Sequence, residues 1–97
     1  MKVILGHRQT GKTVKLIRMS AKTNTYIVAS SQQEASRIFR KAKELGLNIP
    51  LPITFNEFIS HGYYGKGING FLIDNADYLL RSLSTVPILA VSMTKEV

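Results

Sequence analysis

The start of the chain joins a short apolar run, a glycine-containing loop and a second apolar-rich segment. Val3-Ile4-Leu5 is typical of a buried strand, and residues 14–19 are typical of a short helix. Four residues separate Gly6 from Gly11 in the loop between them, and a Lys-Thr pair follows at once. Glycine permits the positive φ values and the close backbone approach that such a turn needs. The sequence therefore predicts a strand–turn–helix unit whose turn can surround an anion.

The whole loop, residues 6–13, fits the Walker A or P-loop pattern Gly-x4-Gly-Lys-Ser/Thr without a mismatch. This pattern predicts that backbone N–H groups of the loop and of the first helical turn hold phosphate oxygens. Lys12 would reach the β- and γ-phosphates, and the Thr13 hydroxyl would bind Mg²⁺. The alternative is a strand–helix turn with no ligand, which has no need for Lys followed by Thr. The predicted cofactor-binding residues are Gly6, His7, Arg8, Gln9, Thr10, Gly11, Lys12 and Thr13.

The composition indicates one globular domain spanning residues 1–97, in which 44% of the residues are apolar. No apolar run approaches the roughly 20 residues of a membrane span, and the N-terminus does not have the pattern of a signal peptide. The absence of cysteine excludes disulfides, thiolate metal sites and a cysteine nucleophile, and it favours a cytoplasmic protein. The two histidines, His7 and His61, are too few for a histidine metal site and are expected at the surface.

The formal net charge of +7 and the pI near 10.0 favour a polyanionic partner, for which nucleic acid is the usual one. The basic residues are spread along the chain and form no arginine-rich tail. The alternative is a solvated surface that is basic without a partner. Tyr63 and Tyr64, with Lys66 nearby, could stack on single-stranded bases, which favours single-stranded DNA. Packed or simply exposed tyrosines are the other interpretation of that pair.

Strands and helices alternate along the chain. Ser31 and Glu34 form a capping box that opens the second helix, Gly46 closes that helix, and Thr54 and Glu57 form another box. The expected strands are the continuous apolar runs Val3–Leu5, Tyr26–Ala29, Phe71–Asp74 and Ile88–Val91. The expected helices run from 12 to about 21, from 32 to about 45, from 55 to about 60 and from 76 to about 83.

This alternation predicts an α/β fold with three α/β/α layers around a four- to five-stranded, mainly parallel sheet. Ligands of such sheets bind at the carboxyl ends of the strands, which is where residues 6–13 would lie. Phe71-Leu72-Ile73-Asp74, about 60 residues after the Walker A motif, resembles Walker B. Its aspartate, Asp74, is predicted to be a Mg²⁺ ligand together with Thr13.

Three segments resemble motifs of superfamily 1 and 2 helicases. Asp74-Asn75-Ala76-Asp77 is similar to their Asp-Glu-Ala-Asp motif, Ser92-Met93-Thr94 to their Ser-Ala-Thr motif, and residues 54–58 to a Thr-x-x-x-Phe segment. The resemblance covers most of the chain, and what the chain resembles is only the first RecA-like domain of a helicase. It implies that the chain binds ATP rather than GTP. The sequence contains no Asn-Lys-x-Asp motif, which recognises guanine. The size is similar to that of small accessory proteins of bacteriophages, whose location would be the host cytoplasm.

The resemblance implies a strand order as well as a ligand. Ser-Met-Thr after the fourth strand favours the RecA-like order, in which that strand separates the Walker A and Walker B strands. In the kinase–GTPase order these two strands are adjacent.

The resemblance also implies the catalytic residues Lys12, Asp74, Asn75, Asp77 and Ser92. In the helicase pattern, the residue after the Walker B aspartate is a glutamate that positions or deprotonates the attacking water. Asn75 stands there in this chain, and an amide accepts no proton, although it can orient water. Asp77, one helical turn onward, is the carboxylate that could substitute. Ser92 and Thr94 would sense the γ-phosphate, or form an ordinary polar strand end.

A lone RecA-like domain does not easily present an arginine finger to its own γ-phosphate. Arg37, Arg40 or Arg81 could serve a neighbouring subunit of a homo-oligomer, or a protein partner could supply the finger; each is otherwise a surface charge. The leading function is a weak or partner-stimulated ATPase in DNA metabolism. The alternative is a non-hydrolysing nucleotide-binding module that regulates a partner by contact. A small-molecule phosphotransferase is disfavoured because 97 residues hardly supply a lid and a substrate pocket.

Overall fold

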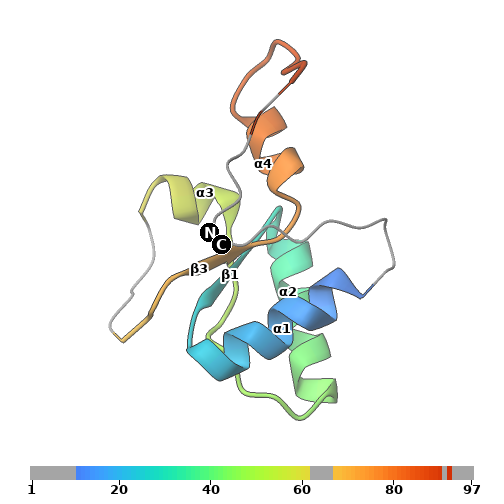
Figure 1. Ribbon diagram of the computed structural model, residues 1–97, viewed down its shortest axis with the longest axis vertical. Coiled ribbons are helices and arrows are strands. Elements are labelled where there is room, and N and C mark those ends of the chain that lie inside the picture. The colour runs from blue at the N-terminus through green and yellow to red at the C-terminus, as the bar shows by residue number, and fades with distance from the viewer. Residues whose placement is uncertain (1–10, 62–66, 91, 93–97) are drawn as a thin grey trace.

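The computed structural model describes residues 11–61, 67–90 and 92 (Figure 1). Several predicted features lie outside these residues: the first strand at 3–5, loop residues 6–10, the Tyr63-Tyr64 pair with Lys66, and Thr94. The elements follow in the order α1 (Lys12–Thr23), β1 (Tyr26–Ala29), α2 (Gln32–Glu44), β2 (Ile53–Thr54), α3 (Phe55–Ile59), β3 (Phe71–Ile73) and α4 (Ala76–Ser82). None of the helices in the described ranges is long and apolar enough to cross a membrane.

The three strands form one parallel sheet in the order β2-β1-β3. β1 is central, and its residue Val28 lies opposite Ile53 of β2 and Ile73 of β3. Helices α2 and α3 lie in the connections between the strands, as parallel pairing requires because the chain must return to the same end of the sheet each time. The α/β class and the parallel sheet are confirmed.

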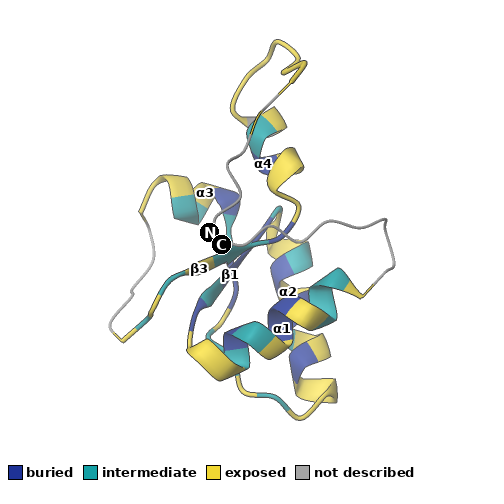
Figure 2. Cartoon of the chain, in the orientation of Figure 1, coloured by how far each residue is buried: buried dark blue, intermediate teal, exposed yellow. Residues whose placement is uncertain are grey.

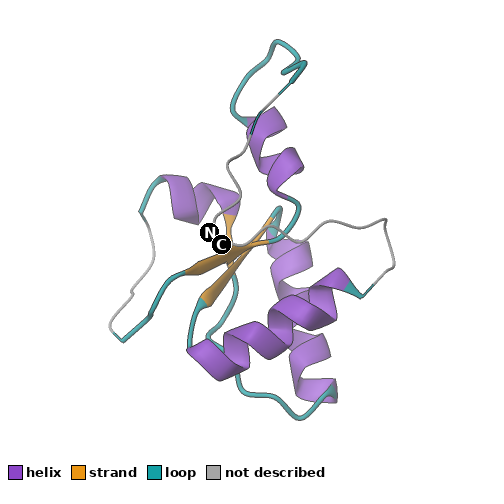
Figure 3. Cartoon of the chain, viewed as in Figure 1, coloured by secondary structure: helices purple, strands orange, loops and turns teal. Residues whose placement is uncertain are grey.

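Helices cover both faces of the sheet (Figure 3). Successive residues of a strand point to opposite faces, so β1 contributes to two cores. Ile27 and Ala29 pack with apolar residues of α1 and α2, whereas Val28 packs with Phe55 of α3 and Leu79 of α4. The three predicted layers are therefore formed by α1 with α2, the sheet, and α3 with α4.

The ends of α2 and the start of α3 are those that the sequence signals predict. The Ser31 side chain caps the start of α2. At its other end Gly46 has a φ of 71°, and the N–H groups of Gly46 and Leu47 donate to the carbonyls of Lys43 and Ala42. This pair of hydrogen bonds is the Schellman motif, which needs a residue in the left-handed conformation. A complete capping box of Thr54 and Glu57 opens α3.

The sheet has three strands within the described residues, not the predicted four or five. The predicted strand at Ile88–Val91 is not formed at positions 88–90, which have no regular structure. The segment that follows α4, residues 83–90, is exposed throughout, and Leu89 is 94% exposed (Figure 2). An apolar run becomes a buried strand only where a neighbouring strand pairs with it and another layer covers it, and these residues have neither.

Two apolar residues of similar size test this arrangement. Ile17 of α1 is fully buried in the first core, so Ile17→Ala is expected to lower the free energy of unfolding by about 2–5 kcal/mol. Leu89→Ala is expected to change it by less than about 0.5 kcal/mol. Urea unfolding followed by circular dichroism measures both. A large loss in Leu89→Ala would show that residues 88–90 are packed in the protein.

Candidate functional site

The described end of the glycine loop leads directly into α1. Gly11 is the N-cap residue, with a φ of 80° and a ψ of 16°, a left-handed conformation that glycine adopts at no steric cost. The helix begins at Lys12, and its first regular hydrogen bond runs from the Lys15 N–H to the Gly11 carbonyl at 3.0 Å. Thr13 follows, half-buried. The Walker A lysine and threonine therefore lie in the first turn of a helix, as their predicted roles require.

Asp74 is a buried carboxylate directly after β3. Its backbone N–H donates to the carbonyl of Val28 at 3.0 Å, which extends the pairing of β3 with β1, and only 7% of the residue is exposed. Burial raises the pKa of Asp74, and the charge of Glu34 raises it further. The charges of Lys12 and Arg37 and a hydrogen bond from the Asn75 backbone N–H act in the opposite direction.

The starts of α1 and α2 and the end of β3 lie at one edge of the sheet. The topology explains this placement, because the parallel strands β1 and β3 end at the same edge. α2 starts there, with only two residues between it and β1. A short turn joins the end of α1 to the start of β1, so α1 runs back along the sheet and begins at that edge as well. Lys12 and Asp74, from the two predicted motifs, are brought together in this way.

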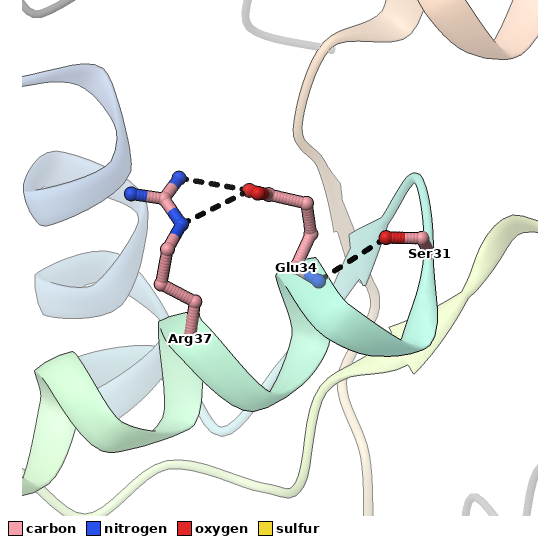
Figure 4. A network of polar contacts seen from close by, with 3 residues as sticks. All are labelled: Ser31, Glu34 and Arg37. Carbon is pink, nitrogen blue, oxygen red and sulfur yellow. Dashed lines mark hydrogen bonds and ion pairs between the residues drawn. The ribbon is translucent and has the colours of Figure 1, made fainter.

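Glu34 and Arg37 also act on Asp74, although the sequence analysis did not predict that they lie near it. The Ser31 Oγ accepts a hydrogen bond from the Glu34 N–H at 3.2 Å, and Glu34 Oε2 accepts from Arg37 Nε at 3.3 Å and Nη2 at 2.8 Å (Figure 4). The hydrogen bond with Glu34 raises the pKa of Arg37. The predicted capping box is thus only half formed: the Ser31 side chain accepts from the Glu34 N–H, while the Glu34 carboxylate makes a charge-assisted bond to Arg37.

A signal for this pair was present in the sequence. Glu34 lies in the first turn after an apolar strand, and a parallel sheet places that turn beside the end of the neighbouring strand.

Asn75 adopts the left-handed conformation, with a φ of 58° and a ψ of 56°, as the N-cap of α4. Its side chain makes no capping hydrogen bond, while its carbonyl accepts from the N–H groups of Tyr78 and Leu79. Asparagine is one of the few residues other than glycine that tolerate this conformation. The backbone therefore favours asparagine at the position where the helicase pattern has glutamate.

The other two predicted catalytic residues, Asp77 and Ser92, are not among the groups that shift the pKa of Asp74. The Asp77 carboxylate is 70% exposed and pairs with Arg81 at 3.7 Å along α4. Ser92 is exposed and has no regular secondary structure. The strand end predicted to position Ser92 is not formed, because residues 88–90 do not pair with the sheet.

Only part of a metal site is present in the described residues. They contain no group of three or more His, Cys, Asp or Glu side chains that could hold a metal ion. Among the described residues at this edge, the Asp74 carboxylate and the Thr13 hydroxyl are oxygen donors, while the Glu34 carboxylate is paired with Arg37. Mg²⁺ is usually held by one or two carboxylates together with substrate phosphates and water, so this set fits a phosphate-bound Mg²⁺.

No family model matches the chain, and neither a curated protein nor a solved structure matches it. An interpretation of the site therefore depends on the sequence motifs and on the geometry of this edge of the sheet.

Burial of Asp74 makes stability depend on pH. Because the folded state raises the pKa of this carboxyl above its unfolded value, its contribution to the free energy of unfolding falls as pH rises through that interval. Asp74→Asn removes the buried charge and is expected to raise Tm by a few degrees at neutral pH, with a smaller gain in acid. Thermal unfolding from about pH 4 to about pH 8 measures this.

The exposed Asp77 provides the matched control, and Asp77→Asn is expected to leave Tm nearly unchanged at every pH. A lower Tm for Asp74→Asn at neutral pH would show that Lys12 and Arg37 outweigh burial.

Proposed function

We propose that this chain is an ATP-binding P-loop domain of the RecA-like type, which holds Mg²⁺-ATP at the carboxyl ends of its strands. The observation that carries the proposal is the placement of Lys12, at the start of α1, and of Asp74, directly after β3, at the same end of the parallel sheet. These residues belong to two separate motifs, and the fold brings them to one edge of a parallel sheet, where α/β proteins bind their ligands. Residues 3–5 would supply a further strand of the sheet.

The residues at this edge have complementary tasks. Lys12, after a left-handed glycine at a helix start, would bind phosphate oxygens. The Thr13 hydroxyl and the Asp74 carboxylate would hold Mg²⁺, which supplies positive charge against the phosphates. Arg37 adds a second cation beside Asp74, and Glu34 holds its guanidinium in place.

The activity that this site supports best is a weak or partner-stimulated ATPase in DNA metabolism, associated with replication, recombination or a helicase. Weak turnover is expected because Asn75 replaces the glutamate of the helicase pattern and Asp77 pairs with Arg81 on the exposed face of α4. Arg37, Arg40 and Arg81 are all exposed, so each could serve a neighbouring subunit as an arginine finger. The basic charge of the chain supports a nucleic-acid partner, with single-stranded DNA favoured.

A second candidate is a module that binds nucleotide without hydrolysing it and regulates a partner protein by contact. The left-handed backbone of Asn75 favours this candidate. In such a conformation a glutamate would be strained, so the absence of the catalytic carboxylate is built into the local backbone. In this case ATP would be a structural ligand.

Binding of Mg²⁺-ATP, measured by calorimetry, tests the proposed site. The wild-type chain is expected to bind, and Lys12→Ala to bind at least about tenfold more weakly, because a charge-assisted phosphate contact is lost. Lys15→Ala is the matched control, since Lys15 lies on the same helix, is exposed and carries the same charge. Equal affinities in the two variants, or no binding by the folded wild-type chain, would contradict the proposal.

Turnover separates the two candidates. If only the missing carboxylate limits hydrolysis, Asn75→Glu is expected to raise ATP turnover at least about tenfold, because general-base catalysis contributes that much or more. Asn75→Gly keeps the left-handed backbone without a carboxylate and should not raise turnover. Release of phosphate is the measurement. An unchanged rate in an Asn75→Glu variant that still binds ATP would favour the non-hydrolysing module.

A further inference from the structure

A surface pocket of about 200 Å³ lies between α2 and the segment that leads into β2. We call it the α2 pocket. It is lined by polar, basic and apolar side chains, chiefly Gln32, Ser36, Phe39, Arg40, Lys43 and Leu51. It is separate from the Lys12–Asp74 edge, although α2 contributes to both.

The basic residues of α2 divide into two kinds. Arg37 pairs with Glu34 at 2.8 Å, and Lys41 pairs with Glu44 at 3.7 Å. The other two, Arg40 and Lys43, line the pocket, and within the described part of the chain neither forms an ion pair with a carboxylate. Two uncompensated cations one helical turn apart at a hollow surface attract an anion.

The pocket also presents an aromatic ring and an exposed aliphatic side chain. The Lys43 Nζ lies 4.7 Å from the centroid of the Phe39 ring, which is half-buried, and Leu51 is 64% exposed. Gln32 and Ser36 add an amide and a hydroxyl at the rim. The Lys43 ammonium thus lies over one face of the ring, and cations beside an aromatic ring are a combination that proteins use to hold a nucleic-acid backbone and stack its bases.

We propose that the α2 pocket binds single-stranded nucleic acid. Arg40 and Lys43 contact backbone phosphates, and one unpaired base packs against Phe39 and Leu51. A single strand is the occupant because a base must leave its stack to reach the ring, which the bases of a duplex do not do. This inference rests on the nucleic-acid partner of the proposed function and assigns that partner's binding to the residues of the α2 pocket. It does not depend on the ATP site.

Fluorescence anisotropy with a labelled oligothymidine of about 20 nucleotides, in the absence of ATP, tests the proposal. Arg40→Ala and Lys43→Ala are each expected to weaken binding about three- to tenfold. Each should also reduce the slope of log affinity against log salt by about 0.7, the value for one phosphate contact on a single strand. Lys41→Ala is the matched control on the same helix, because its charge is already paired with Glu44, and it should change affinity by about twofold or less.

The ring is tested separately with Phe39→Leu, which keeps an apolar side chain and removes the stacking surface. This variant is expected to bind about tenfold more weakly with an unchanged salt slope, since no cation is lost. Circular dichroism checks that each variant is folded. If Phe39→Leu does not fold, Phe39→Tyr is used instead. Its aromatic ring is expected to preserve binding of the oligonucleotide.

Three results would overturn the proposal. They are an equal loss of oligonucleotide affinity in Lys43→Ala and Lys41→Ala, tighter binding of a duplex of the same length, and no oligonucleotide binding by the wild-type chain. Lys12→Ala is expected to bind the oligonucleotide as the wild type does. A wild-type chain that binds the oligonucleotide but not Mg²⁺-ATP would therefore refute the nucleotide site alone.

Discussion

The pairing of β1 with β3 is the contact on which the candidate site depends. Its register runs from Tyr26 opposite Phe71 to Val28 opposite Ile73. The ladder extends one residue further with the bond from the Asp74 N–H to the Val28 carbonyl. A slip of one residue would move every side chain of β3 to the other face and carry Asp74 away from Lys12. Leu72 packs against the core formed with α1 and α2 and Ile73 against the core formed with α3 and α4, so such a slip would break the packing of both residues.

The opposite end of the sheet is held by a second set of bonds, remote from the site. Asn24, in the left-handed conformation, ends α1, and its side chain donates to the Gly67 carbonyl at 2.7 Å. The Asn69 side chain donates in return to the Thr23 carbonyl at 2.8 Å. These bonds join the end of α1 to the segment that leads into β3. They fix the direction in which α1 ends and β3 begins.

The sequence predicted the elements whose signals are local, and it missed those that depend on distant pairing. The periodicity of α2, its cap at Ser31 and its end at Gly46 predicted that helix well. β2 has only two residues, which carry no periodicity, and it is a strand solely because it pairs with β1. Residues 88–90 have the composition of a strand without a partner. The Glu34–Arg37 pair was missed for a related reason, since a local motif accounted for Glu34 before its spatial neighbours were known.

The charges around Asp74 offset part of the cost of burying its carboxylate. Lys12 and Arg37 oppose the cost of its burial, while Glu34 adds to that cost and also binds Arg37. Burial and Glu34 together outweigh the two cations, so the pKa of Asp74 stays raised. In the proposed site, Mg²⁺ would add positive charge beside Asp74 and so act in the same direction as Lys12 and Arg37.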